Sequence, residues 1–429
     1  MRLIVHDYAG HPFPIDLSRQ LAINGHTVTH AYASQLLTPR GILQAQKTDS
    51  VRLGFAAVPM SPDYRNNKYS FLKRVRYERE YGHKLVRLMI EMKPDLILSG
   101  QTPSEPQLNL ITAANKLRIP VVSWVQDFYS MAVDKLARKK LPLVGAMAGV
   151  WYRYLDRQCF TKSAHIVAIT EDFLPMLASF GVPKEKVSVI PNWAPLDALS
   201  LRPRDNPWSR RHGLNHKFVF LYSGTLAMKH NPDLLRRLAV HFRHEANVRV
   251  VVISEGPGAD YLKRCKKAEE LANLILKPFQ AFEEMPEVLA SADVLVTILE
   301  SEAGIFSVPS KVHTYHAAGR AILGAMPEEN LASRIIKHQH SGLSVTPDDV
   351  DAFISSAERL RLDPVLVRQM GQQGRAYAER EFRIDRISAR FETVFRKAMG
   401  DDAANQLVHP LSGPKLQQPE GAQFGDKEG

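Results

Sequence analysis

Continuous apolar runs recur along the chain and alternate with stretches whose apolar positions follow helical spacing. The clearest runs lie at residues 94–99, 119–125 and 165–170 in the first half, and at 218–223 and 294–299 in the second. Runs of this kind predict strands that are buried on both faces of a parallel sheet, and the stretches between them predict the covering helices. The pattern predicts an α/β protein with two doubly wound, Rossmann-like domains that face a cleft.

A change of composition separates the two halves. Residues 194–216 are rich in Pro, Arg and Asn and show little periodicity, so we interpret them as a linker between domains at 1–193 and 217–380. Helical spacing returns in residues 381–399, which predicts a terminal helix. Residues 400–429 combine Pro, Gln, Gly and charges without periodicity, and we expect a disordered tail there.

Size and composition narrow the class of protein. The 429 residues exceed what one core usually holds and fit two domains. Cys159 and Cys265 are the only cysteines and have no paired spacing, which predicts a reducing compartment and no disulfide or zinc framework. The apolar runs are too short for a membrane span of roughly 18 residues or for a signal peptide. We therefore expect a cytoplasmic protein that is soluble or peripheral on the membrane.

Positive charge is concentrated in the first half. Residues 1–200 hold 25 Lys and Arg against 16 Asp and Glu, a net charge of +9 out of the +11 of the whole chain. Residues 65–93 predict a basic amphipathic helix, and residues 135–157 combine a basic cluster with an apolar, aromatic stretch. Both segments suit the headgroup region of an anionic membrane. A solvated helix face that packs on its own domain would show the same pattern.

Residues 293–324 predict a strand, a loop, a helix and a second strand. The loop leaves the first strand at its carboxyl end, which is where open α/β sheets bind ligands. A carboxylate there can accept from sugar hydroxyls, and backbone N–H groups near a helix start attract a phosphate. A surface loop with an ordinary helix cap would have a similar sequence. The candidate ligand-binding residues are Glu302, Ala303, Gly304, Ile305, Ser310 and Lys311.

This segment resembles the donor-binding motif of retaining GT-B glycosyltransferases of the family 4 type. In that motif a glutamate, a Phe-Gly-like turn and a second glutamate precede an Ala-Ala-Gly-Arg helix end. Glu302 matches the first glutamate, whereas Ser310 stands at the second. Pro309, Ser310 and Lys311 instead resemble a Pro-Ser-Lys branch that builds bacterial exopolysaccharide and O-antigen, of the colanic-acid and L-fucosamine transferase type. A hydroxyl binds a ribose more weakly than a carboxylate does, so the resemblance leaves the nucleotide base open.

The resemblance implies further contacts with the donor. A strand that ends in Ser-Gly-Thr, followed by a polar loop with a lysine, is similar to the diphosphate cradle of the family. A threonine stands where the family often has an arginine, and a later turn resembles the family's Gly-x-Gly-Pro sequence. The backbone near Phe279 is implied to lie against the base, although a core position fits that residue equally. The implied donor-binding residues of these segments are Gly224, Thr225, Lys229, Gly256 and Phe279.

The acceptor side is implied by the first half of the chain, whose opening strand, Gly-containing loop and helix resemble the family's acceptor domain. The strand at 119–125 leads to Asp127 at the carboxyl edge of the sheet. Asp127 is the candidate for binding and deprotonating the acceptor hydroxyl. An aspartate that caps the next helix is the alternative. The other implied acceptor-binding residues are Gly10, His11, Gln126 and Phe128.

The resemblance implies a retaining glycosyltransferase that moves a hexosyl or acetamidohexosyl group from a nucleotide-diphosphate sugar. The acceptor would be lipid-linked or a saccharide, in the biosynthesis of cell-surface polysaccharide such as lipopolysaccharide. The family implies no cofactor and no metal, and we expect an anionic membrane surface but no nucleic acid as partner. In this architecture the terminal helix crosses back to the first domain. Two alternatives are a GT-B epimerase acting on a UDP-sugar, and a non-catalytic basic protein that binds membrane or nucleic acid.

Overall fold

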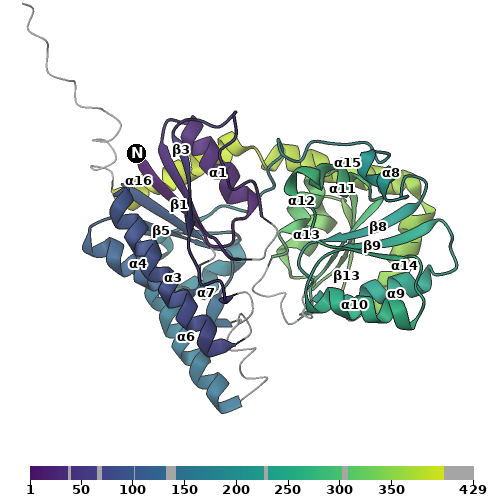
Figure 1. Ribbon diagram of the computed structural model, residues 1–429, viewed down its shortest axis with the longest axis horizontal. Coiled ribbons are helices and arrows are strands. Elements are labelled where there is room, and N and C mark those ends of the chain that lie inside the picture. The colour runs from purple at the N-terminus through teal and green to yellow at the C-terminus, as the bar shows by residue number, and fades with distance from the viewer. Residues whose placement is uncertain are drawn as a thin grey trace, which may run out of the picture.

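The chain forms two α/β domains that lie side by side, each with one parallel sheet flanked by helices (Figure 1). This arrangement confirms the predicted fold class of two doubly wound, Rossmann-like domains. The computed structural model describes residues 1–36, 40–64, 70–100, 102–131, 142–226, 230–301 and 308–400.

The first sheet has seven strands in the order β3-β2-β1-β4-β5-β6-β7. The strands are β1 (Arg2–Asp7), β2 (Thr27–Ala33), β3 (Leu53–Val58), β4 (Leu96–Gly100), β5 (Val121–Val125), β6 (His165–Ala168) and β7 (Val187–Val189). The helices are α1 (Pro12–Ile23), α3 (Phe71–Met92), α4 (Ser104–Lys116), α6 (Pro142–Lys162), α7 (Leu174–Ser179) and the 3-10 turns η1 (Glu171–Phe173) and η2 (Lys184–Lys186). Leu3 of β1 is level with Val28 of β2 on one side and with Leu96 of β4 on the other.

The second sheet has six strands in the order β10-β9-β8-β11-β12-β13. The strands are β8 (Phe218–Ser223), β9 (Val248–Ile253), β10 (Leu274–Lys277), β11 (Val294–Ile298), β12 (Ala321–Ala325) and β13 (Gly342–Val345). The helices are α8 (Pro207–Arg211), α9 (Pro232–His241), α10 (Pro257–Ala268), η4 (Phe282–Glu284), α11 (Met285–Ala290), α12 (Lys311–Ala317), α13 (Leu331–His338), α14 (Val350–Leu362), α15 (Pro364–Glu381) and α16 (Ile384–Met399). Strand β8 lies between β9 and β11, and all pairs are parallel.

Burial of the strands follows the apolar pattern of the sequence. Every residue of β4, β5, β11 and β12 is buried, which matches their continuous apolar runs. The edge strand β3 has partly exposed residues between its buried ends. Interior strands have a neighbouring strand on each side and are covered on both faces. An edge strand lacks one of these neighbouring strands. Because all strands of a sheet are parallel, the loops that follow them leave at one common edge.

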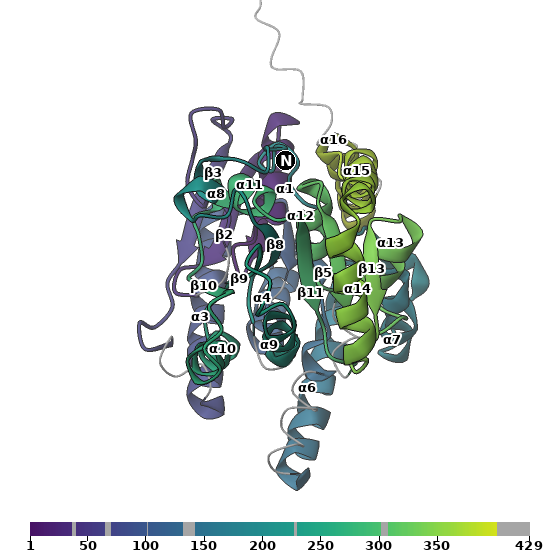
Figure 2. The same cartoon turned by 90° about the vertical axis from the view of Figure 1, so that its right-hand side faces the viewer.

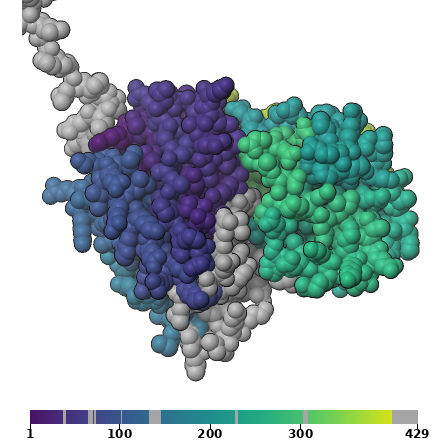
Figure 3. Space-filling view, in the orientation of Figure 1, coloured from purple at the N-terminus to yellow at the C-terminus, as the bar shows by residue number. Residues whose placement is uncertain are grey.

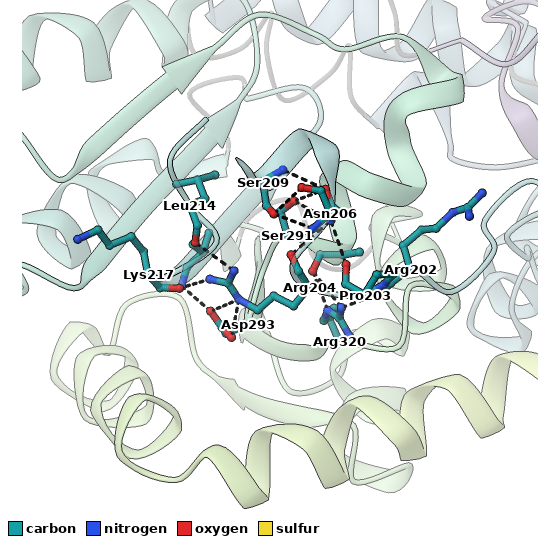
Figure 4. Close-up of polar contacts among 12 residues, drawn as sticks. Arg202, Pro203, Arg204, Asn206, Ser209, Leu214, Lys217, Ser291, Asp293 and Arg320 are labelled. Atoms are coloured by element: carbon teal, nitrogen blue, oxygen red, sulfur yellow. Dashed lines mark hydrogen bonds and ion pairs between the residues drawn. The ribbon is translucent and has the colours of Figure 1, made fainter. Parts of the chain in front are cut away.

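The segment predicted as a linker is folded onto the second domain in its second half (Figure 4). Asn206 caps helix α8, accepting from the Ser209 N–H at 2.9 Å, and its amide donates to the Ser291 hydroxyl at 3.2 Å. The Arg204 guanidinium binds the Asp293 carboxylate at 2.9 Å, and Asp293 also accepts from a backbone N–H of β8. Helix α8 has only five residues, so it is too short to show a helical period in the sequence.

Helix α16 packs on the first domain although it follows the second domain in sequence (Figure 1). The ring of Phe391 lies 4.9 Å from that of Trp124 on β5. Near the start of β2, Glu392 accepts hydrogen bonds from Asn24 at 2.8 Å and from the His26 ring at 3.1 Å. The end of the described chain thus returns to the first domain beside the start of the linker, where the Phe391 ring lies 6.1 Å from the Trp193 ring.

Candidate active site

A cavity of about 320 Å³ lies between the two domains. The domains meet along the middle of the molecule, where the purple first domain borders the green second domain (Figure 3). The first domain contributes the start of α1, and the second contributes the carboxyl end of β8 and the start of α12. The cavity brings together six of the residues that the sequence singled out: His11, Gly224, Thr225, Phe279, Ser310 and Lys311.

The Lys311 side chain joins two segments that the sequence predicted separately as phosphate contacts. Its Nζ atom lies 3.6 Å from the centroid of the Tyr222 ring and would lie 3.4 Å from a Cβ atom on Gly224. Gly224 has a φ of +123°, a backbone conformation that favours glycine. An ammonium group therefore lies against the loop that follows β8 and contains Thr225.

Helix α12 begins at this lysine but is short. It has seven residues, and its N-cap residue Ser310 makes no side-chain capping hydrogen bond. A helix of this length has a small dipole, so the charge of Lys311 contributes more to the attraction for an anion than the helix does. Ser310 is exposed and lines the cavity beside this charge. The phosphate contact predicted from the sequence thus depends mainly on a side chain.

Two tyrosines fix the end of β8 at the cavity. The Tyr222 hydroxyl donates to the Thr225 carbonyl at 2.7 Å, and the Tyr315 hydroxyl accepts from the Ser223 N–H at 3.1 Å. Burial raises the pKa of both phenols well above the ordinary value, so both remain neutral hydroxyls at physiological pH. These bonds hold the loop that Lys311 contacts.

The predicted contact with the nucleotide base lies on the second-domain wall of the cavity. Phe279 is half-buried there, and its backbone N–H donates to the Glu255 carboxylate at 3.3 Å. Met285 continues this part of the wall and gives it apolar character. Gly256, in contrast, precedes α10 with a φ of +98° and does not line the cavity. The structure places Phe279 at the cavity and Gly256 in the turn behind it.

His11 occupies the first-domain side of the cavity. It precedes α1, where its backbone N–H donates to Asp7 and its ring Nδ1 lies 3.5 Å from the Asp7 carboxylate. Burial alone would raise the pKa of Asp7, but the charge and hydrogen bonds of His11 outweigh it and lower the pKa overall. Asp7 is therefore an anion that fixes the loop and the position of the His11 ring.

An aromatic wall adjoins His11. The Trp193 ring stacks on Trp124 at 5.7 Å and meets the edge of Phe13 at 5.5 Å. Its indole N–H donates to the Asp16 carboxylate at 2.8 Å. Asp16 is half-buried, and the reduced solvation of its carboxylate raises the pKa to about 7. The ring of Trp193 is thereby held in one orientation at the cavity.

The other acceptor residues predicted from the sequence lie away from this cavity. Asp127 is exposed and, with Gln126, lines a separate small pocket of about 50 Å³ in the first domain. The Gln126 amide exchanges two hydrogen bonds with Asn192, at 3.2 and 2.5 Å. Phe128 is 2% exposed and belongs to the core, and Gly10 is a buried turn residue with a φ of +77°. Their contacts with an acceptor stay predictions.

Five predicted site residues lie outside the described residues: Lys229, Glu302, Ala303, Gly304 and Ile305. The described residues that flank them are informative. Thr225 and His230 lie on either side of the segment with Lys229, and Leu299 and Val308 lie on either side of the segment with Glu302. All four flanking residues line the cavity.

Sequence reasoning missed several cavity residues. Arg40 lines the first-domain wall, where its guanidinium donates to the Ala33 carbonyl at 2.7 Å. It lies outside the apolar runs and helical stretches on which the predictions were based. His230 directly follows the predicted Lys229, so the polar character of that loop was the available signal. Trp193 is the last residue of the first predicted domain, and only the packing of α1 against it shows that it faces the cavity.

Within the described ranges, none of the helices combines the length and the apolar character needed to cross a membrane. Nowhere in the same ranges do three or more His, Cys, Asp or Glu side chains gather as metal ligands would.

Comparison with protein families gives a match for each domain. Residues 14–198 match the family described as Glycosyltransferase Family 4, and residues 217–363 match the family described as Glycosyl transferases group 1. A similar sequence is the putative colanic acid biosynthesis glycosyl transferase WcaI of Escherichia coli (strain K12). It is 22% identical over 348 residues, which cover 79% of this chain and 83% of the relative.

Solved structures show the same two-domain arrangement. HepE from Anabaena, solved in complex with UDP-glucose, has a TM-score of 0.67 at 13% identity and covers 92% of this chain and 99% of its own. WaaG, a glycosyltransferase involved in lipopolysaccharide biosynthesis, has a TM-score of 0.64 at 13% identity with the same coverage. At these identities the likeness shows the fold alone, and that fold is the predicted GT-B arrangement.

Proposed function

We propose that this chain, a glycosyltransferase with a family 4 domain followed by a group 1 domain, transfers a sugar from a nucleotide-diphosphate sugar to a lipid-linked or saccharide acceptor. The sequence-based prediction of a glycosyltransferase is confirmed by these two family matches. Relatives named for colanic acid and lipopolysaccharide biosynthesis support a place in cell-surface polysaccharide synthesis. The transfer of a hexosyl or acetamidohexosyl group with retention of configuration, on the colanic-acid, L-fucosamine or O-antigen branch, is part of the proposal.

The observation that carries the donor site is the position of Lys311 against Gly224 in the interdomain cavity. A diphosphate placed there meets an ammonium group at the end of β8, and the amides that follow Glu302 are proposed to join it. Structures of a relative in complex with UDP and UDP-glucose support a nucleotide sugar as donor. The base would lie toward Phe279, and Glu302 would accept hydrogen bonds from the sugar hydroxyls.

The proposed reaction forms one bond and breaks one. The acceptor hydroxyl oxygen bonds to the anomeric carbon while the bond from that carbon to the phosphate oxygen breaks. The nucleoside diphosphate leaves with the electron pair, and Lys311 stabilises its growing charge. Among the described residues, His11 is the first-domain imidazole that lines this cavity, and imidazole is the most frequent general base in enzymes. We therefore add His11 to Asp127 as a candidate to bind and deprotonate the acceptor hydroxyl.

Transfer is proposed to need no divalent metal and no other cofactor, because cationic side chains neutralise the leaving group. Incubation with EDTA followed by an assay of sugar transfer tests this part. Unchanged turnover supports it, and a loss of turnover that Mg²⁺ or Mn²⁺ restores contradicts it.

The donor is identified by screening UDP-, GDP- and dTDP-sugars for thermal stabilisation, since a ligand that binds the folded state raises the unfolding temperature by mass action. One nucleotide class is expected to stabilise the protein at millimolar concentration and to support transfer when an acceptor is added. The epimerase alternative predicts instead that the UDP-sugar alone is converted into its epimer. Absence of stabilisation by all three classes would contradict the proposed donor site.

A further inference from the structure

Helix α6 exposes a row of large apolar side chains. Met147, Val150, Trp151 and Tyr154 are 74%, 69%, 49% and 50% exposed, and their spacing of three, four and seven positions places them on one face. The rings of Trp151 and Tyr154 stack at 5.7 Å. We call these four residues the α6 stripe. Isolated exposed apolar residues are common on soluble proteins, but a continuous row of them marks an interaction surface.

A second face of α6 already has its partner. Tyr152, Leu155 and Cys159 are buried where α6 packs on α4 and on the residues after β5. The helix is therefore apolar on two sides, of which its own domain covers one. Packing of α6 on its own domain therefore does not explain why the stripe is apolar.

The stripe lies on a part of the molecule that projects. Helix α6 extends from the first domain beyond the other helices (Figure 1, Figure 2). Its last residue, Lys162, is followed by β6 at His165, so the half with the stripe is the half remote from that junction. Because a helix that precedes a parallel strand runs back from the carboxyl edge of the sheet, the stripe lies toward that edge. His11 follows β1 at the same edge.

Charge identifies the partner. Arg153 and Arg157 are exposed, and each follows a stripe residue by three positions, so they flank the stripe along the helix. The first 200 residues carry the net charge of +9. Two copies of this face would bring like charges together, which disfavours a dimer. The surface of an anionic lipid bilayer can bind the arginines through its phosphates and the stripe through its apolar part.

We propose that the α6 stripe docks the enzyme on an anionic lipid bilayer, with Trp151 and Tyr154 in the headgroup region and Arg153 and Arg157 on lipid phosphates. Aromatic side chains prefer that interface, and basic residues near it are attracted by anionic lipid. The inference deepens the proposed function, on which it rests for a lipid-linked acceptor. Docking in this way would bring a lipid-linked acceptor within reach of the carboxyl edge of the first domain.

Trp151 provides a direct probe. The chain has four tryptophans, of which Trp124, Trp193 and Trp208 are buried. Full-length protein mixed with vesicles of phosphatidylglycerol and phosphatidylcholine is expected to show a blue shift of its tryptophan emission, and quenching by brominated lipid. Vesicles of phosphatidylcholine alone are expected to bind at least tenfold more weakly. Absence of both signals with phosphatidylglycerol overturns the proposal.

Matched variants separate the stripe from general charge. Val150→Ser with Tyr154→Ser is expected to weaken vesicle binding at least tenfold, and Arg153→Glu with Arg157→Glu should do the same. The controls are Leu362→Ser with Val365→Ser, and Arg264→Glu with Arg368→Glu, which alter exposed residues of the second domain. Equal losses in stripe and control variants would mean that charge or exposed area alone drives binding, and would overturn the proposal.

Two further measurements keep the outcome unambiguous. A monomer–dimer equilibrium that the Val150→Ser, Tyr154→Ser variant abolishes would identify a second copy as the partner and overturn the bilayer. Stabilisation by the nucleotide sugar is measured on every variant, and it should equal that of the wild type because no stripe residue lines the cavity that contains Lys311. Intact vesicle binding without any nucleotide-sugar binding would contradict the proposed function and support the docking surface. Nucleotide-sugar binding without vesicle binding would contradict only the docking surface.

Discussion

The Lys311 ammonium nitrogen lies 3.6 Å from the centroid of the Tyr222 ring. Strands β8 and β11 are neighbours in the second sheet, so the residues that follow them share one edge. A cation over an aromatic ring gains electrostatic attraction, and the gain grows when solvent is excluded. The contact fixes the charge of Lys311 at the loop after β8 before any ligand binds. A prepositioned cation of this kind suits a leaving group that develops negative charge.

Removal of this charge should weaken donor binding. Lys311→Met keeps the apolar part of the side chain and is expected to raise the Kd for the nucleotide sugar at least tenfold, about 1.4 kcal/mol. Titration calorimetry with the donor found in the thermal screen measures the change. Lys263→Met removes an exposed lysine from α10 of the same domain and should leave the Kd unchanged. An unaltered Kd in Lys311→Met would exclude this lysine from the diphosphate site.

Glu302→Ala is expected to abolish sugar transfer while the protein stays folded. The carboxylate is proposed to hold the sugar hydroxyls in the reactive orientation, and loss of orientation lowers turnover more than it lowers affinity. Turnover and the thermal unfolding curve are measured together. Glu283→Ala, at an exposed position of the same domain, serves as the control and should retain wild-type turnover. Wild-type turnover in Glu302→Ala would remove the residue from the mechanism.

His11 and Asp127 can be ranked by substitution. His11 lines the interdomain cavity, whereas Asp127 lines the small first-domain pocket. We therefore expect His11→Ala to lower kcat by roughly a hundredfold to ten-thousandfold, the usual range for loss of a general base, with donor affinity unchanged. Asp127→Ala should lower kcat less. A larger loss in Asp127→Ala than in His11→Ala would show that the acceptor hydroxyl lies toward the smaller pocket, as the sequence first suggested.

Asp16 should make stability depend on pH. Its pKa is raised to about 7 in the folded protein, above the ordinary 3.8. Between these values the unfolded state loses a proton that the folded state keeps, so the free energy of unfolding falls as pH rises from about 4 to about 7. Asp16→Asn removes this dependence and retains an oxygen for Trp193. At pH 8 the variant is expected to be more stable than the wild type by roughly 1–3 kcal/mol.

Urea unfolding at pH 4.5 and pH 8 measures this prediction. The difference between variant and wild type should be small at the lower pH and large at the higher one. A constant difference at both pH values would contradict a raised pKa for Asp16, because an effect of packing alone does not titrate.

The sequence by itself determined the fold class, because strands that are buried on both faces of a parallel sheet require apolar residues at consecutive positions. It also singled out Gly224 and Ser310, which line the interdomain cavity, since loops that follow such strands lie at one edge. The helical period of α16 was likewise visible. These are properties of neighbours in sequence, and a periodic pattern records them.

Tertiary structure alone decided which of these residues meet. Lys311 reaches Gly224 because β8 and β11 are adjacent in a sheet whose strand order the apolar pattern does not specify. His11 reaches the cavity, and Asp127 does not, because of how the two domains are set against each other. The sequence of α6 showed an apolar, aromatic stretch, but only the packing of the helix on α4 left Trp151 exposed. Contacts between distant segments depend on the sum of all packing interactions, and no local pattern contains them.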